Sequence, residues 1–371
     1  MIEDIRSALS KVIDPELHRS ITELGMVESI EEKNGAVEVK ILLTIAGCPM
    51  RDTLQSDIGK AITAVSGVKS FNIIFGAMSQ EQRDKVKALM RNGRDRHIVF
   101  ASPESLTRVI AVASGKGGVG KSSITANLAV AAARKGFKVG ILDGDVYGHS
   151  IPRLMGIVGK RPTALDQMFI PVEAHGVKVV SMEMFKPERD DAVAYRGPLL
   201  HRVLEQLLAD AYWGDLDFLF LDLPPGTGDL AISLGQLIPN SEVIVVTTPQ
   251  IAAAEVAERA GRIAHTMHQQ IIGVVENMSS VICPNCGEVQ HLFGEGGGEA
   301  SAKKLSTLIG ADIPLLGKVP FTPQLREGGD VGTPIMKADP STQAAREIDE
   351  IFEKISKRSK SLVGVRLGLS T

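Results

Sequence analysis

The stretch of this sequence with the clearest chemistry is Gly-Lys-Gly-Gly-Val-Gly-Lys-Ser-Ser at 115–123. Closely spaced glycines let backbone N–H groups converge on phosphate oxygens, because no Cβ stands in the way. Lys121 can reach the β- and γ-phosphates of a nucleotide, and the Ser122 hydroxyl can bind Mg²⁺. The residues predicted to hold the nucleotide are therefore Gly115, Lys116, Gly117, Gly118, Val119, Gly120, Lys121, Ser122 and Ser123.

The segments on either side of this loop support a phosphate-binding role. Residues 108–114 are apolar and β-branched, which is typical of a buried parallel strand. Residues 124–135 are rich in Ala and Leu, which predicts a helix. The N-terminus of that helix adds a partial positive charge that favours phosphate. The alternative, a glycine-rich turn without chemical function, explains neither the full motif nor the strand and helix around it.

Aspartates end the next two segments that are predicted as buried strands, 138–143 and 216–222. Asp222 has the position of a residue that holds Mg²⁺ through a water molecule, and a charge at a buried strand end is costly without a partner. Asp143 and Asp145 can also face a metal–phosphate site. Aspartates often cap turns as well, and this alternative stays open for both.

Cys283 and Cys286 form a second candidate metal site. Two thiols at this spacing can bind one metal centre or form a redox pair. A zinc ribbon needs a second pair, whereas the chain has three cysteines in all, and His291 is a possible third ligand without a visible fourth. A symmetric dimer would bring together four thiolates, which suit a 4Fe–4S cluster or a zinc ion. Two inert cysteines are the plain alternative.

The order of the remaining segments predicts the fold that positions these residues. Further buried strands are expected at 242–247 and 271–277, and helical patterns occupy 198–211, 228–237, 251–268 and 299–309. Alternating strands and helices predict an α/β fold with a doubly wound, mostly parallel sheet. Ligands bind at the carboxyl ends of the strands in such sheets, and each motif above falls at one of these ends.

The first ninety or so residues predict a separate small α/β domain. Helices are expected at 2–13 and 50–65, strands at 25–31, 36–44 and 67–75, and a hairpin turn at Asn34-Gly35. A charged helix at 79–93 carries Gln80, Arg83, Asp84, Lys87 and Arg91 and is expected to be mostly solvated. The predicted organisation is a small domain at 1–93, a linker at 94–107, a nucleotide-binding domain at 108–355 and a flexible tail at 356–371.

Length and composition agree with a two-domain globular protein and exclude several classes of partner. A chain of 371 residues is long for one core. A net charge of −3 predicts no nucleic-acid partner, and the absence of a long apolar run predicts no membrane partner. The N-terminal stretch lacks the features of a signal peptide, and three cysteines are too few for a disulfide framework. We therefore expect a cytoplasmic protein.

The second lysine of the loop, Lys116, connects the sequence to a known class. Lys-Gly-Gly-x-Gly-Lys-Ser resembles the deviant P-loop of the ATPases that include ParA, MinD, the nitrogenase iron protein and the Mrp/ApbC carriers. The resemblance implies that ATP is the nucleotide, that Lys116 crosses a dimer interface to the partner's nucleotide, and that Asp145 orients the attacking water. It also implies that Asn277 reads the adenine base, with residues 317–320 near that base. A solvated Lys116 and a simple turn at Asn277 are the alternatives.

Four motifs together resemble the Mrp/ApbC family of iron–sulfur cluster carriers over residues 108–350. They are the loop itself, Asp-Gly-Asp-Val-Tyr-Gly from Asp143, Asp-Leu-Pro-Pro-Gly-Thr-Gly-Asp from Asp222, and Cys-Pro-Asn-Cys from Cys283. The first ninety residues resemble the small iron–sulfur-assembly domain family in three motifs, which begin at Asp14, Glu23 and Thr44 and include Cys48. Cys48 is a reactive thiolate or a small apolar residue.

The family resemblance implies a slow ATP hydrolase that uses Mg²⁺ and forms a homodimer. Cys283 and Cys286 of both subunits would bind a bridging 4Fe–4S cluster, which passes to apo iron–sulfur proteins, and cluster-assembly proteins are further expected partners. Ser122 and Asp222 would hold the Mg²⁺. The alternative function is a nucleotide-switched positioning or partitioning ATPase of the MinD/ParA type, because both kinds of protein use the same loop.

Overall fold

The structure is a computed structural model of the chain. It describes residues 1–44, 50–90, 96–102, 104–145, 148, 150–186, 197–226, 229–283 and 285–358. The chain forms two compact units: Met1–His97 with Thr163–Ile170, and Ile98–Pro162 with Pro171–Thr371. The domain limits predicted above stay predictions, and each unit is described by itself.

The first unit is built on a three-stranded sheet in the order β1-β2-β3. Strands β1 and β2 are antiparallel, and β2 and β3 are parallel. The predicted hairpin turn joins β1 to β2, with φ +54° at Asn34 and φ +88° at Gly35, as a two-residue turn of this kind requires. The elements of this part of the chain are α1 (Ile2–Leu9), β1 (Val27–Lys33), β2 (Ala36–Leu43), α2 (Arg51–Thr63), β3 (Ser70–Ala77) and α3 (Gln80–Met90).

A short hairpin from much later in the sequence also belongs to the first unit. It consists of β6 (Thr163–Leu165) and β7 (Met168–Ile170), which pair antiparallel. Asp166 occupies its turn with φ +55°. These strands were not predicted from the sequence, because three residues are too few to show the alternation of apolar and polar side chains that marks a strand.

The second unit contains a nine-stranded, mostly parallel sheet, and the predicted α/β fold is confirmed. The strand order is β13-β12-β11-β4-β10-β5-β9-β8, and β14 pairs with β12. Only β8 and β13 run antiparallel to their neighbours in this sheet of described strands. The strands are β4 (Arg108–Ser114), β5 (Val139–Asp143), β8 (Val172–Ala174), β9 (Val177–Ser181), β10 (Phe218–Asp222), β11 (Glu242–Thr247), β12 (Gln270–Ile282), β13 (Val289–Gln290) and β14 (Leu315–Phe321).

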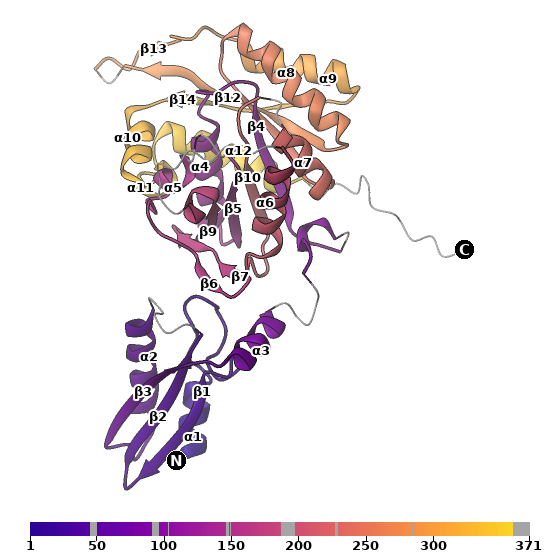
Figure 1. The fold of residues 1–371 in the computed structure, drawn as a ribbon. Helices are drawn as coiled ribbons and strands as arrows, with labels where there is room; N and C mark the ends of the chain where they lie inside the picture. Colours follow the sequence, from indigo (N-terminus) through magenta and orange to yellow (C-terminus); the bar gives the residue numbers. More distant parts are fainter. Residues whose placement is uncertain are drawn as a thin grey trace. The chain divides into compact units, whose positions relative to one another are not determined.

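Helices cover both faces of this sheet (Figure 1). Helices α4, α5, α10, α11 and α12 pack against one another on one face, and α6, α7, α8 and α9 form a row on the other. Their bounds are α4 (Lys121–Arg134), α5 (Ser150–Leu154), α6 (Gly197–Ala209), α7 (Asp229–Leu237), α8 (Ile251–Thr266), α9 (Gly297–Ile309), α10 (Pro323–Val331), α11 (Ile335–Ala338) and α12 (Gln343–Ser356). No helix in the described parts of the chain is long and apolar enough to cross a membrane.

The core between α4, α12 and the sheet is aromatic and aliphatic. Phe218 packs edge-on against Phe137 and Phe352, with ring centroids 5.2 Å and 5.4 Å apart. Every residue of β4, β5, β10 and β11 is buried, as expected for strands covered on both faces. This burial explains why those four strands could be recognised in the sequence as continuous apolar runs.

Arg108 ties the first strand of this core to the end of α12. Its Nη2 and Nε donate to Glu242 Oε2 at 2.7 Å and 2.9 Å, and its Nη1 donates to the carbonyl oxygen of Ile355 at 2.7 Å. Both charged side chains are less than a tenth exposed. Breaking such a pair leaves an uncompensated buried charge, which is strongly destabilising.

We expect Arg108→Met to lower the free energy of unfolding of the second unit by about 3–5 kcal/mol. Arg326→Met, which removes an exposed pair with Asp330, should cost less than about 1 kcal/mol. Urea unfolding followed by fluorescence and circular dichroism would measure both. The double variant Arg108→Met/Glu242→Met should recover much of the loss, and a double variant no more stable than Arg108→Met would contradict this account.

Candidate functional site

The glycine-rich loop runs from the end of β4 to the first residue of α4. Gly118 and Gly120 have φ values of +83° and +78°, which only glycine adopts readily. Gly120 also approaches another strand closely, since a Cβ added there would lie 2.2 Å from the Asn277 Nδ2 atom. The loop therefore requires glycine for its backbone conformation and for its contact with β12. Its N–H groups stand at a helix N-terminus, the arrangement that binds phosphate.

The predicted lysine, serine and aspartate meet at the start of α4. Lys121 Nζ lies 2.6 Å from Asp222 Oδ1, and Ser122 Oγ donates to Asp222 Oδ2 at 2.6 Å. Thr125 Oγ1 donates to Asp222 Oδ1 at 2.8 Å. Asp222 is fully buried, so these three partners compensate its charge. Thr125 was not among the predicted site residues, although it lies one helical turn after Lys121 on α4 and so shares a face with it.

This group of side chains suits a magnesium ion. Mg²⁺ prefers hard oxygen ligands, and the Ser122 hydroxyl and the Asp222 carboxylate supply them within one hydrogen bond of each other. The Lys121 ammonium beside them can also bind phosphate oxygens. The structure thus brings together the three residues predicted for metal and phosphate binding.

Asp143 and Asp145 lie beside this group at the end of β5. Asp143 pairs in register with Asp222 on the neighbouring strand. Asp143 Oδ1 accepts from the Asp145 N–H at 3.1 Å, and Asp143 Oδ2 accepts from Ser181 Oγ at 3.0 Å. Asp145 Oδ1 accepts from the Gly148 N–H at 2.9 Å. Both aspartates therefore bind turn amides, as the turn interpretation expects, and they do so next to the candidate metal site.

Burial, and then the negative charge of Asp222, raise the pKa of Asp143 to about 8. An aspartate in the unfolded chain titrates near 3.8. Between these values the folded state holds a proton that the unfolded state has lost. The stability of the nucleotide-free protein must therefore fall as the pH rises through this window, by up to about 1.4 kcal/mol per pH unit for one proton.

We expect Asp143→Asn to flatten this pH dependence, because the amide has the shape of the protonated carboxyl group and does not titrate. Its Oδ1 can still accept from the Asp145 N–H, and its Nδ2 would donate to Ser181 Oγ. Unfolding of the nucleotide-free protein between about pH 5 and pH 8 would measure the slope. The exposed Asp312→Asn variant should keep the slope of the original protein. An unchanged slope in Asp143→Asn would show that this carboxyl group is ionised throughout the range.

Asn277 lies on β12 against the other side of the loop. Its Nδ2 donates to the Val119 carbonyl oxygen at 2.9 Å. Its Oδ1 is buried and has no hydrogen-bond partner among the described residues. A buried acceptor of this kind is costly unless a donor satisfies it, and the amino group of a bound base could do so. The neighbouring strand β14 contains residues 317–320, and its Val319 pairs in register with Asn277.

The side chain of Lys116 is exposed, whereas that of Lys121 is buried. Its carbonyl oxygen accepts from Ser114 Oγ at 3.1 Å, and no ion pair joins its ammonium to a residue that the structure describes. The loop after β10 comes back to the same place, since the Gly226 N–H donates to the Ser114 carbonyl oxygen at 2.8 Å. Lys116 therefore has no carboxylate partner within the described part of the chain.

The cysteine pair occupies the tight turn between β12 and β13. The Cys283 N–H donates to the Glu288 carbonyl oxygen, and the Gly287 N–H donates to the Cys283 carbonyl oxygen, both at 2.9 Å. Backbone N–H groups of Cys286 and Asn285 point at the Cys283 sulfur and, with the Cys286 thiol, lower the pKa of Cys283. Both thiols are free and at least partly exposed. The predicted strand at 271–277 extends to Ile282 and so carries the pair directly.

His291 is not available as a third ligand in this arrangement. Its Nδ1 lies 3.1 Å from the Ser279 carbonyl oxygen, and its Nε2 lies 3.0 Å from Glu295 Oε1. Within the described ranges, no group of three or more His, Cys, Asp or Glu side chains could hold a metal ion. The described part of one chain thus offers two thiols at this site. Cys48 lies outside the described residues.

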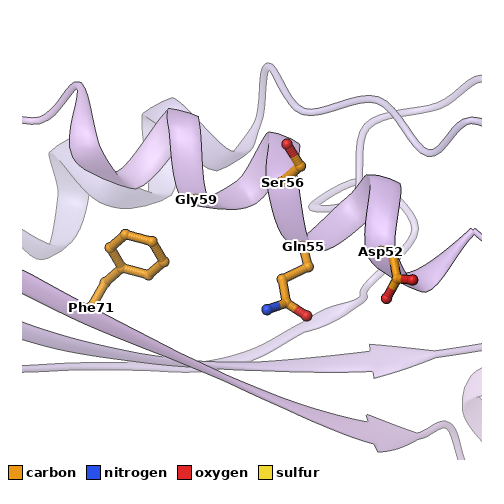
Figure 2. A pocket seen from close by; sticks show the side chains of 5 residues that line it. All are labelled: Asp52, Gln55, Ser56, Gly59 and Phe71. Carbon is orange, nitrogen blue, oxygen red and sulfur yellow. The ribbon is translucent and has the colours of Figure 1, made fainter.

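A separate hollow lies in the first unit between α2 and β3 (Figure 2). Its volume is about 470 Å³, and its lining consists of Asp52, Gln55, Ser56, Gly59 and Phe71. Figure 2 shows the Asp52 carboxylate at one end and the Phe71 ring below the helix at the other. The lining contains a carboxylate and no cation, so it has no charged partner for phosphate.

The doubly wound sheet, the glycine loop between β4 and α4, and the group around Asp222 define the class of protein: a P-loop NTPase domain. The family described as NUBPL iron-transfer P-loop NTPase matches residues 105–356, and the one described as iron-sulfur cluster assembly protein matches residues 2–73. The chain belongs to the NUBPL iron-transfer P-loop NTPase family. The family resemblance expected from the motifs is confirmed for both parts of the chain.

Two relatives are similar over nearly the whole length. The iron-sulfur cluster carrier protein of Mycobacterium tuberculosis is 53% identical over 367 residues, which cover 98% of this chain and 96% of the relative. The iron-sulfur cluster carrier protein of Deinococcus radiodurans is 40% identical over 357 residues, which cover 96% and 95%. The two-part organisation of this chain is therefore shared with these proteins.

Solved structures match the second unit. A nucleotide-binding protein from Archaeoglobus fulgidus in complex with ADP is 36% identical, with a TM-score of 0.52, over 62% of this chain and 92% of that one. The septum site-determining protein MinD of Pyrococcus horikoshii, complexed with Mg-ADP, is 24% identical, with a TM-score of 0.50, over 71% and 100%. The likeness to MinD concerns the fold alone.

Proposed function

We propose that this protein is an ATP-binding and ATP-hydrolysing carrier that holds a 4Fe–4S cluster between two copies of the chain and delivers it to apo iron–sulfur proteins. One observation carries the proposal. Strand β12 bears Asn277 beside the glycine loop and ends at Ile282, directly before Cys283, so one strand connects the residue proposed to contact the base with the first proposed cluster ligand. The names of the relatives from Mycobacterium tuberculosis and Deinococcus radiodurans support the same function.

In this proposal the loop and its neighbours bind ATP. Backbone N–H groups between Gly117 and Lys121 surround the phosphates, and the Lys121 ammonium exchanges its carboxylate partner for phosphate oxygens. The orphaned Oδ1 of Asn277 accepts from the adenine amino group. Mg²⁺, held by Ser122 and through water by Asp222, would neutralise phosphate charge that develops during hydrolysis. The ADP in the Archaeoglobus fulgidus structure supports this assignment.

Hydrolysis would require a second subunit. Asp145 would orient the attacking water, since it follows the end of β5, where its N–H donates to Asp143 beside the candidate metal site. Lys116 is exposed and has no carboxylate partner within the described part of the chain, which suits a cation that acts on the nucleotide of the partner subunit. Because the reaction then waits for dimer formation, we expect turnover to be slow.

The cluster would be bound by thiolates from both subunits. Each chain has two thiols at this site, and a two-fold axis doubles them to the four ligands that a 4Fe–4S cluster takes. Thiols must lose their protons to bind iron, and the amides around Cys283 favour its thiolate. Exposure of Cys286 leaves room for a recipient protein to approach the cluster.

The location and the further partners expected from the sequence are also proposals. We propose a cytoplasmic location, contact with cluster-assembly proteins, and no nucleic-acid or membrane partner, in line with the net charge of −3. The alternative, a MinD/ParA-type positioning function, is supported by a shared fold alone. Residues 359–371 of the predicted tail lie outside the described residues.

Substitution of the two loop lysines should separate binding from hydrolysis. Lys121→Ala should weaken ATP binding by about 2–4 kcal/mol, because the phosphates lose a charged hydrogen bond. Lys116→Ala should leave ATP affinity unchanged and abolish turnover. Isothermal calorimetry and phosphate release would measure the two effects. Equal affinity in Lys121→Ala would refute the phosphate site, and full turnover in Lys116→Ala would refute action across the dimer.

Substitution of the cysteines should locate the cluster. Cys283→Ser or Cys286→Ser should prevent cluster binding, because serine is a poor ligand for cluster iron and symmetry removes two of four ligands at once. ATP affinity should stay unchanged in both variants. Cys48→Ser is the matched control and should keep the bridging cluster. The measurement is iron and sulfide content per dimer after anaerobic reconstitution.

Two results would contradict this assignment. Full cluster content in Cys283→Ser would refute the bridging site, and loss in Cys48→Ser alone would move the cluster to the first unit. Tight binding of zinc with no uptake of iron and sulfide would replace the cluster by a structural ion at the same thiols.

A further inference from the structure

Strand β3 lies at an open edge of the small sheet. The order β1-β2-β3 leaves one side of β3 without a partner among the described strands. Its eight residues include no charge and no proline, the two features that most often protect an exposed edge from another strand. Two of its large apolar side chains are well exposed, Phe71 by 44% and Ile74 by 39%. This edge is therefore suited to pairing with a further extended chain.

The register between β2 and β3 fixes which backbone groups face that edge. The two strands pair without a shift along the whole of β3. Directly after β3, the Met78 N–H donates to the Leu43 carbonyl oxygen at 2.9 Å. The N–H and C=O groups of successive strand residues point to alternate sides, so the even-numbered residues face β2. The backbone groups that face the open edge are then those of residues 71, 73, 75 and 77.

The hollow between α2 and β3 adjoins this edge (Figure 2). At one end the Phe71 ring faces Gly59, since a Cβ added to Gly59 would lie 3.1 Å from Phe71 Cζ. At the other end is Asp52, seven positions earlier on α2 and so about 10 Å away along the helix. Figure 2 shows the Asp52 carboxylate and the Gln55 carboxamide directed below the helix, toward the strands. An occupant with an apolar part and a cationic end would match both ends of this hollow.

The chain itself covers the neighbouring ring on the same face of β3 with a cation. Phe71 and Phe75 are four positions apart in a strand and therefore lie on one face. The Arg51 Cζ atom lies 5.0 Å from the centroid of the Phe75 ring, a cation–π contact. The lining of the hollow supplies no such cation for Phe71. A long cationic side chain from outside could lay its methylene stem on the Phe71 ring and bring its head group to Asp52.

We propose that the β3 edge and this hollow together form a docking site for an extended basic segment of a partner protein. The segment adds a strand to β3, and one of its Lys or Arg side chains enters the hollow on the α2 side. A second copy of β3 does not meet this requirement, because none of its residues carries a charge. The proposal goes beyond the proposed function and depends on neither ATP nor cluster binding.

An NMR titration of the isotope-labelled full-length protein tests the site. The probe is a short synthetic peptide of alternating threonine and valine with one central arginine. We expect it to shift the amide signals of residues 70–78 with a dissociation constant of about 1 mM or tighter. The same peptide with citrulline, which has the shape of arginine without its charge, should bind at least about fivefold more weakly. A peptide with an N-methylated backbone should bind at least about tenfold more weakly, because it has no N–H groups for the strand edge.

Asp52→Asn should bring the affinities of the arginine and citrulline peptides to about the same value. Asp52 stands in the first turn of α2, where a carboxylate also stabilises the helix, so the ratio of the two affinities is the readout. A loss of stability alone would weaken both peptides equally. The matched control is Asp57→Asn on the same helix, which removes an ion pair with Lys60 at 2.9 Å and should keep the original ratio.

Each part of the proposal has a result that overturns it. If the arginine peptide does not bind, or shifts signals other than those of residues 70–78, the docking site is refuted. Equal binding of the N-methylated peptide would refute strand addition. Equal binding of the citrulline peptide to the original protein, or an unchanged ratio in Asp52→Asn, would refute the basic occupant.

Discussion

The buried carboxylate of Asp222 is the constraint on which the second unit depends. A fully buried charge at a strand end is tolerated only with close partners, and Lys121, Ser122 and Thr125 supply them from the first turn of α4. The same contacts fix the start of α4 relative to β10. The glycine loop between β4 and α4 is thereby held in shape before any ligand arrives, and a site held in this way loses little entropy on binding phosphate.

The order of the parallel strands decides which other residues lie beside the glycine loop at the carboxyl edge of the sheet. Strand β4 lies between β10 and β11, and β5 and β12 lie one strand further out on either side. The carboxyl ends of β5 and β12 therefore bring Asp143 and Asn277 to opposite flanks of the loop. Strand β12 continues beyond this edge to Ile282, and that length is what joins the nucleotide edge to the cysteine turn.

The segment between β5 and β9 contributes residues to both units. Its two ends meet at Asp143, and its middle, the β6–β7 hairpin, folds with α3. A single chain segment thus starts at a residue proposed to act on ATP and contributes a hairpin to the small unit. Asp166 and Lys87 are 79 positions apart in sequence, and neither belongs to a motif, so only the tertiary structure shows that they pair.

The sequence by itself determined the α/β class, the positions of the buried strands β4, β5, β10 and β11, and the identity of the loop, aspartate and cysteine residues. It could do so because these features are local: apolar runs, glycine spacing and a Cys-x-x-Cys turn depend on near neighbours. Tertiary structure alone decided the contacts of Thr125, the engagement of His291 by Ser279 and Glu295, and the pairing of Asp166 with α3. Those depend on distant segments meeting in space, and short strands or single charges carry no periodic signal of the partner they will meet.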